Sequence, residues 1–126
     1  MKIIYLVLAF VLTINTALSR DGFILDSLSE ARLLSKRTNR PVLLIFGAEY
    51  CTYCSPLKSD ILSHKLSPEA DNYIVCYIDI KNMPNTKDEY GVSIIPDSRI
   101  YLDDMEVSSL KGYGIKKYRS WLQNVK

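Results

Sequence analysis

Two cysteines separated by two residues, Cys51 and Cys54, are the side chains of this sequence best suited to chemistry. A thiolate can attack a disulfide sulfur, and a nearby second thiol can then attack the mixed disulfide that forms. This spacing predicts a redox pair for thiol–disulfide exchange. Cys51 would be the attacking thiol, and Cys54 would be the resolving thiol and the less exposed of the two.

The elements on either side of the pair must position it. The apolar run 42–46, bounded by a proline and a glycine, is typical of a strand buried on both faces of a parallel sheet. A helix is predicted from Cys51 onward, and its unpaired N–H groups and partial positive charge would stabilise the Cys51 thiolate. Pro56 would remove the bond to the carbonyl of Thr52 and bend the first turns of that helix.

The rest of the chain alternates helices and strands. Before the Cys pair we expect a helix that is capped by the box Ser27-Leu28-Ser29-Glu30 and stopped by Pro41. After the pair we expect a second helix cap at 67–69, with Pro68 at the first helical position, then a buried strand over 73–80 and a short helix over 87–90. The chain should end in a hairpin of 99–102 and 106–110 around Asp103-Asp104 and a C-terminal helix with an apolar stripe from Ile115 to Val125. This order predicts one α/β domain over 20–126. Its central mixed sheet would be parallel in its first part, end in an antiparallel C-terminal hairpin, and carry helices on both faces.

The first residues are typical of a secretory signal peptide. Met1-Lys2 gives a positive start, an apolar run follows, and Ala17 and Ser19 are small residues at the positions that favour cleavage after Ser19. Residues 1–19 are therefore predicted to be removed, and the protein is expected to be periplasmic or secreted. The alternative is an uncleaved membrane anchor, although 3–18 is shorter than the roughly 20 residues that usually span a bilayer.

Charge and composition narrow the partners. The whole chain carries a net charge of +2, with basic residues spread along it, so no nucleic-acid partner is implied, and a membrane contact follows only from an uncleaved leader. Export would place the three cysteines in an oxidising compartment. We expect a monomer that exchanges disulfides with protein partners and an unidentified redox partner protein, without a metal or organic cofactor.

Two segments give the sequence a family resemblance. The stretch from Pro41 to Cys54, with Ala-Glu-Tyr directly before the Cys pair, resembles the active-site segment of thioredoxins, and Tyr90-Gly91-Val92 leading to Pro96 resembles the same family's segment that ends in a cis-proline. The two blocks stand in the right order and at a suitable distance. The resemblance implies a thioredoxin fold, a cis Pro96 packed against the Cys pair, and pairing of the Ile95 backbone with an extended substrate.

Two positions depart from the thioredoxin pattern. Thioredoxins carry a buried Asp six residues before the first Cys, thought to assist proton transfer at the resolving thiol, and this position is Ile45. The residue after the cis-proline, often Thr, is Asp97, whose carboxylate beside the pair would raise a thiol pKa. Glu49 is a candidate replacement proton acceptor. The residues between the cysteines are Thr52-Tyr53 and not Gly-Pro, so the family's reduction potential does not carry over.

Two tyrosines bracket the pair. Tyr50 and Tyr53 are predicted either to form an apolar rim that receives extended protein segments or to be ordinary surface and core residues.

Other interpretations of the cysteines remain open at this stage. One is a non-enzymatic thioredoxin-fold binding module in which the disulfide is structural. Another is a small zinc module in which Cys51, Cys54, His64 and Cys76 supply three sulfurs and an imidazole. Against zinc, a second close ligand pair is missing and Cys76 lies in an apolar strand, where an inert core thiol is expected.

Overall fold

The computed structural model describes residues 23–125. Its centre is a four-stranded sheet in the order β2-β1-β3-β4. β1 (Val42–Gly47) and β2 (Ile74–Asp79) run parallel, β3 (Asp97–Leu102) is antiparallel to β1, and β4 (Met105–Lys111) is antiparallel to β3. The predicted mixed sheet with an antiparallel C-terminal hairpin is confirmed.

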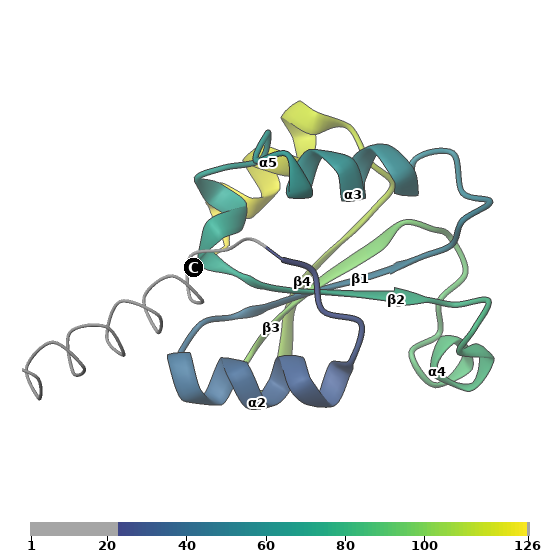
Figure 1. Ribbon diagram of the computed structural model, residues 1–126, viewed down its shortest axis with the longest axis horizontal. Coiled ribbons are helices and arrows are strands. Elements are labelled where there is room, and N and C mark those ends of the chain that lie inside the picture. Colours follow the sequence, from purple (N-terminus) through teal and green to yellow (C-terminus); the bar gives the residue numbers. More distant parts are fainter. Residues whose placement is uncertain (1–22, 126) are drawn as a thin grey trace, which may run out of the picture.

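Helices cover both faces of this sheet (Figure 1). α3 (Cys54–Leu62) and α5 (Ile115–Asn124) lie on one face, here called the α3 face, and α2 (Leu28–Thr38) lies on the other, the α2 face. The 3-10 helix η1 (Glu69–Asn72) precedes β2, and α4 (Pro84–Glu89) lies on the connection from β2 to β3. The predicted α/β arrangement with helices on both faces is therefore confirmed.

β1 is buried along its whole length, and its side chains alternate between two apolar clusters. Leu43 and Ile45 belong to the cluster on the α3 face, together with Leu57 of α3 and Tyr118 of α5. The neighbours of these two residues, Leu44 and Phe46, belong to the cluster on the α2 face with Ala31 of α2. Because successive side chains of a strand point to opposite faces, one continuous apolar run fills both halves of the core.

The first helix begins where its sequence predicts, but it ends at Thr38, before the predicted stop at Pro41. The Ser27 hydroxyl oxygen accepts a hydrogen bond from the Glu30 N–H at 3.3 Å, which satisfies one of the free N–H groups at the start of α2. Asn39 ends the helix in the left-handed conformation with φ 55°.

The hairpin turn is also where the sequence predicts it. Asp103 and Asp104 both have positive φ, as a two-residue hairpin turn of type I′ requires. The strands on either side are longer than predicted, since β3 begins at Asp97 and β4 at Met105.

Other boundaries differ from the predictions. Pro68 follows a cis peptide bond and comes before the single turn of η1, so it is not the first residue of a helix. α4 begins at Pro84, where proline costs no helical hydrogen bond, and not at Lys87.

One sheet contact has no counterpart among the predictions. Leu25 forms a parallel bridge with Cys76, in which its N–H donates to the Val75 carbonyl at 2.9 Å and its carbonyl accepts from the Tyr77 N–H at 2.7 Å. The segment before α2 therefore lies along the outer edge of β2.

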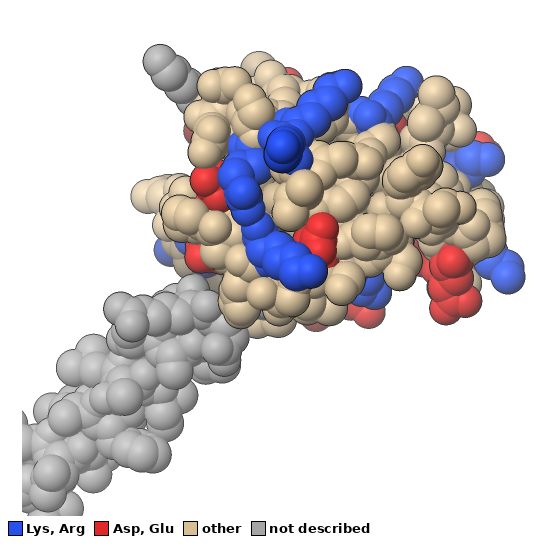
Figure 2. Space-filling model, turned by 90° about the horizontal axis from the view of Figure 1, so that it is seen from above, with Lys and Arg blue, Asp and Glu red and all other residues tan. Residues whose placement is uncertain are grey.

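The surface of the α3 face is mostly uncharged, with basic side chains gathered on part of it and acidic side chains next to them (Figure 2). Ion pairs near α3 and α5 include Lys65 with Asp60 at 3.9 Å and Arg119 with Glu69 at 3.6 Å. Within residues 23–125, no helix has the length and apolar character that crossing a membrane requires. The predicted leader, 1–19, lies outside the described residues.

Candidate active site

The Cys pair follows the end of β1 through a short turn. After the buried Ala48 the chain reaches the surface at Glu49 and Tyr50, and the Cys51 N–H donates to the Ala48 carbonyl at 3.2 Å. Cys54 is the first residue of α3. The buried strand and the helix thus fix the two ends of a four-residue segment that contains both sulfurs.

Cys51 and Cys54 form a disulfide, with their Cα atoms 5.3 Å apart. Cys51 is half-buried, whereas Cys54 is completely buried. The prediction that Cys54 is the less exposed sulfur is confirmed. Of the two bonded residues, Cys51 is therefore the one in contact with solvent.

The predicted start of the helix is wrong by three residues. α3 begins at Cys54, and its first backbone bond runs from the Leu57 N–H to the Tyr53 carbonyl at 3.4 Å. Pro56 consequently lies in the first turn, where N–H groups have no partner within the helix, and it removes none of the helical hydrogen bonds. Cys51 precedes the helix, and its disulfide to Cys54 keeps its sulfur at the helix N-terminus.

Pro96 lies next to the start of this turn. The Ile95–Pro96 peptide bond is cis, as the resemblance implied, and Pro96 is buried. In the antiparallel pairing of β1 and β3, Phe46 is opposite Asp97, so the residue before Asp97 comes beside Gly47, where the chain leaves β1 for the Cys pair.

The tyrosines that bracket Cys51 are both on the surface. Tyr50 is 70% exposed and Tyr53 is 60% exposed, and Ile94, just before the cis-proline loop, is 57% exposed. Large apolar groups exposed to water beside a disulfide form an apolar surface of the kind that protein contacts use.

Asp97 differs from the expectation. Its side chain is 1% exposed and forms two contacts with Arg99, Nε to Oδ1 at 3.2 Å and Nη2 to Oδ2 at 3.1 Å. The Arg99 guanidinium lies over the rings of Phe46 and Tyr90, on the α2 face. The carboxylate is thus neutralised by an arginine on the side of the sheet opposite α3.

The position of the missing Asp lies beside a tyrosine. Ile45 is buried in the cluster on the α3 face, and its partner on the neighbouring strand β2 is Tyr77. A Cβ atom on Gly47 would overlap the Tyr77 hydroxyl oxygen and lie 3.1 Å from the Cys54 sulfur. The hydroxyl and the sulfur therefore both lie close to Gly47, and glycine at this position leaves room for them.

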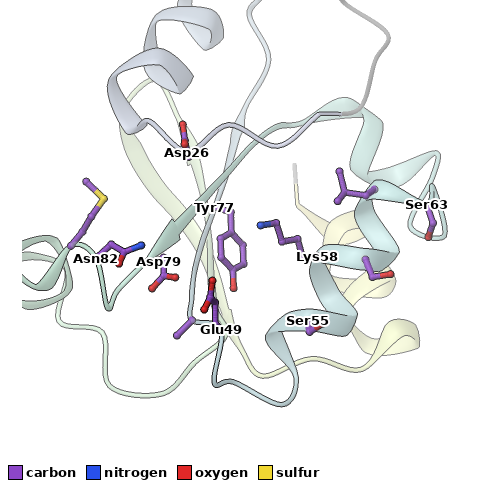
Figure 3. A pocket seen from close by; sticks show the side chains of 12 residues that line it. Asp26, Glu49, Ser55, Lys58, Ser63, Tyr77, Asp79 and Asn82 are labelled. Atoms are coloured by element: carbon purple, nitrogen blue, oxygen red, sulfur yellow. The ribbon is translucent and has the colours of Figure 1, made fainter.

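An open groove of about 890 Å³ lies beside Tyr77 and the end of β2 (Figure 3). Tyr77 and Asp79 come from β2, Lys58 from α3 and Glu49 from the turn after β1, and the Lys58 ammonium lies 4.8 Å from the centre of the Tyr77 ring. Glu49 was a candidate from its sequence position, whereas Tyr77 and Lys58 were not. No local sequence signal distinguishes Tyr77 from the other eight tyrosines.

The structure does not assemble the zinc set. Cys76 belongs to the cluster on the α2 face, and His64 is exposed in the turn after α3. Among residues 23–125, no three His, Cys, Asp or Glu side chains are placed to hold a metal ion. Burial raises the pKa of the Cys76 thiol to about 12, and the charges of Asp26 and Glu30 add to the shift. An inert core thiol at this position agrees with the prediction.

The fold and the disulfide together define a protein of the thioredoxin class. The model of the thioredoxin-like family matches residues 24–101, and the chain belongs to that family. No curated protein sequence matches the chain.

Solved thioredoxins share the fold. Poplar thioredoxin h superposes with a TM-score of 0.68 at 15% identity, covering 82% of this chain and 94% of that one. Thioredoxin from Fasciola hepatica gives 0.66 at 19% identity, covering 82% and 98%. The germline-specific thioredoxin Deadhead of Drosophila melanogaster gives 0.67 at 14% identity, covering 82% and 99%. Family and disulfide together indicate a general redox role.

Proposed function

We propose that this chain is an exported thiol–disulfide oxidoreductase that exchanges disulfides with protein substrates through Cys51 and Cys54. The observation that carries the proposal is the asymmetry of the disulfide, in which a half-buried Cys51 is bonded to a fully buried Cys54 at the first residue of α3. An accessible sulfur is needed for attack, and a protected one for resolution.

In the reducing direction, the Cys51 thiolate attacks one sulfur of a substrate disulfide. A Cys51–substrate bond forms, the substrate S–S bond breaks, and the leaving sulfur takes a proton from water. The Cys54 thiolate then attacks the Cys51 sulfur, the Cys51–Cys54 bond forms, and the second substrate sulfur leaves as a thiolate. Two electrons pass to the substrate, and the reverse sequence oxidises a substrate dithiol. The protein's own sulfurs carry the electrons, so the proposal includes no cofactor.

The substrate surface in this proposal consists of Tyr50, Tyr53 and the Ile95–Pro96 loop. The exposure of both tyrosines and the position of Pro96 beside the end of β1 support it. An extended substrate segment would pair with the Ile95 backbone and lay apolar side chains on the tyrosines. The partners are protein thiols or disulfides, and the protein acts on them as a monomer.

Insulin reduction in the presence of dithiothreitol tests the exchange. The wild-type chain and Cys76→Ala should accelerate the precipitation of insulin, because Cys76 is not part of the pair. Cys51→Ser should match the reaction without protein, since it lacks the attacking sulfur, and Cys54→Ser should accumulate a mixed disulfide that mass spectrometry detects. A wild-type curve equal to the blank would overturn the enzymatic proposal in favour of a binding module with a structural disulfide.

The direction of net electron flow follows from the reduction potential of the Cys51/Cys54 couple. Equilibration with glutathione buffers measures it, with Cys76→Ala as the background so that only the pair is counted. A value near about −270 mV would make the protein a donor to disulfides, and a value near about −120 mV would make it an acceptor of electrons from thiols.

Export is proposed from the leader sequence. In a bacterial or eukaryotic host, the protein recovered from the periplasm or the medium should begin at Arg20 if cleavage follows Ser19. A full-length chain found in the membrane fraction would support the anchor instead.

A further inference from the structure

We infer that the Tyr77 hydroxyl controls the protonation of Cys54, by donating a hydrogen bond to the Cys54 thiolate during resolution. This inference rests on the proposed exchange function. It assigns to a residue of β2 the support of the resolving thiol that thioredoxins are thought to obtain from a buried carboxylate on β1.

The first support is position. Ile45, which occupies the place of that carboxylate, has Tyr77 as its direct partner on the neighbouring strand. The apolar Ile45 can neither donate nor accept a proton. The polar group nearest to this site on the adjacent strand is thus supplied by Tyr77.

The second support is the short separation of the two side chains across the space above Gly47. One added carbon atom there would touch both the Tyr77 hydroxyl and the Cys54 sulfur. The two atoms are therefore no further apart than the sum of two short contacts, and glycine is the residue that leaves this space open.

The third support is the state of the hydroxyl and its access to water. Burial, with a smaller contribution from the Asp79 charge, raises the pKa of Tyr77, so the hydroxyl keeps its proton and acts as a donor near neutral pH. Tyr77 also lines the open groove, where water can take the proton that Cys54 loses (Figure 3). In the resolving step, the Tyr77 hydroxyl oxygen takes the proton of the buried Cys54 thiol and releases its own proton to water in the groove, and the hydroxyl then donates a hydrogen bond to the thiolate.

Four charged groups line the groove around the hydroxyl. They are Lys58 on α3, Glu49 in the turn after β1, Asp79 at the end of β2, and Asp26 before α2. The Lys58 ammonium favours a Cys54 thiolate, whereas the carboxylates oppose it. The effect of Tyr77 must therefore be separated from that of Lys58.

The test measures the pKa of Cys54 from the pH dependence of its Cβ chemical shift. All variants carry Cys51→Ser, so that Cys54 is the one thiol of the pair. Hydrogen bonds to charged groups are worth about 1.5 kcal/mol or more, so Tyr77→Phe should raise the Cys54 pKa by about one unit. Tyr101→Phe is the matched control, because Tyr101 is a half-buried tyrosine packed on the α2 face, and its removal should leave this pKa unchanged.

Two further variants locate the cause. Gly47→Ala should shift the Cys54 pKa in the same direction as Tyr77→Phe, because the new methyl group displaces the hydroxyl without removing it. No shift in Tyr77→Phe, with a folded protein shown by its circular dichroism spectrum, overturns the inference. A shift seen in Lys58→Met but not in Tyr77→Phe also overturns it and assigns the effect to the ammonium.

The consequence for exchange is measured in a chain that retains both cysteines. A Cys54 pKa one unit higher makes the thiolate about tenfold rarer below that pKa, but each thiolate about threefold more nucleophilic, so resolution of the mixed disulfide should slow about threefold. If the wild-type chain forms no mixed disulfide, the proposed function fails, yet the Cys54 titration can still be read. If exchange proceeds and the titration is unmoved by Tyr77→Phe, only the present inference fails.

Discussion

Cys54 and Cys76 are both completely buried, yet they lie on opposite sides of the sheet in different surroundings. Cys54 begins a helix, is bonded to a half-buried sulfur and has a hydroxyl and an open groove nearby. Cys76 lies in the middle of β2, within apolar side chains that α2 covers. The two cysteines therefore share burial but differ in what surrounds them. The groups that can stabilise a thiolate, and the route to a partner sulfur, distinguish the two.

The two sides of the sheet also differ in the surroundings of their charged side chains. On the α2 face, the buried Asp97 carboxylate is paired with Arg99 and closed off from water. On the α3 face, Glu49 and Lys58 line an open groove. The buried pair on the α2 face thus contributes to stability, whereas the charges that line the groove remain in contact with solvent.

The largest expected effect comes from breaking the pair on the α2 face. Arg99→Met leaves the Asp97 carboxylate buried without a partner and should lower the free energy of unfolding by roughly 3 to 5 kcal/mol. Urea denaturation of the oxidised protein measures it. Asp97→Asn combined with Arg99→Met should recover part of the loss, because no unpaired charge remains. If the Asp97 carboxylate did act on the Cys pair, Arg99→Met would instead shift the reduction potential of the Cys51/Cys54 couple and leave the free energy of unfolding nearly unchanged.

A smaller effect is expected from Cys76 at alkaline pH. Its pKa is raised from 9.0 to about 12 in the folded state, so its contribution to stability is complete below pH 9 and is lost as the pH rises toward 12. By pH 11, the unfolded state should gain about 3 kcal/mol from ionising this thiol, because two units separate that pH from the unfolded pKa.

Urea denaturation of the oxidised wild type and of Cys76→Ala, repeated from pH 8 to pH 11, checks the Cys76 prediction. The variant should be the less stable at pH 8 because of the cavity it creates, and the difference should narrow as the pH rises. Tyrosines that titrate in the same range are common to both proteins and cancel. A constant difference would mean that Cys76 ionises as easily in the folded protein as in the unfolded one.

The smallest effect concerns the helix that covers Cys76. Ser27→Ala removes the cap of α2 and should cost about 1 kcal/mol, which is roughly a fivefold change in any opening that α2 controls. Alkylation of Cys76 in the oxidised protein should accelerate by that factor. Ser29→Ala is the comparison: it removes a hydroxyl hydrogen-bonded to that of Ser27 at 3.0 Å but leaves the bond from the Glu30 N–H in place, so it should have less effect. An equal rate in Ser27→Ala and wild type would show that Cys76 becomes accessible without loosening of α2.

Much of the fold was predictable because the local sequence patterns agree with the burial and the turns that the tertiary structure requires. The apolar run 42–46 is hydrophobic at every position, as a strand buried on both faces must be, and the Ser27 cap and the Asp103-Asp104 turn depend on residues within a few positions of each other. The Leu25 bridge escaped prediction because a single bridging residue has no periodicity, and its partner lies 51 positions further along the chain.

The site was predictable to a lesser extent. The spacing of Cys51 and Cys54 predicted the pair that forms the disulfide, and the cis Pro96 followed from a resemblance. The direction of the Asp97 side chain depends on where β3 begins, since a shift of one residue exchanges the two faces of a strand. The start of α3 at Cys54 depends on how the turn leaves β1, which residue types alone do not fix.

The sequence by itself determined the chemistry that is available: two cysteines at redox spacing, a strand before them, a proline far along the chain, and no carboxylate at position 45. Only the tertiary structure decided what stands beside the sulfur of Cys54. The parallel register of β1 and β2 sets Tyr77 opposite Ile45, and the missing side chain of Gly47 lets the hydroxyl approach the sulfur. The physical reason is distance along the chain, because Tyr77 is 23 residues from Cys54 and only the sheet brings the two together.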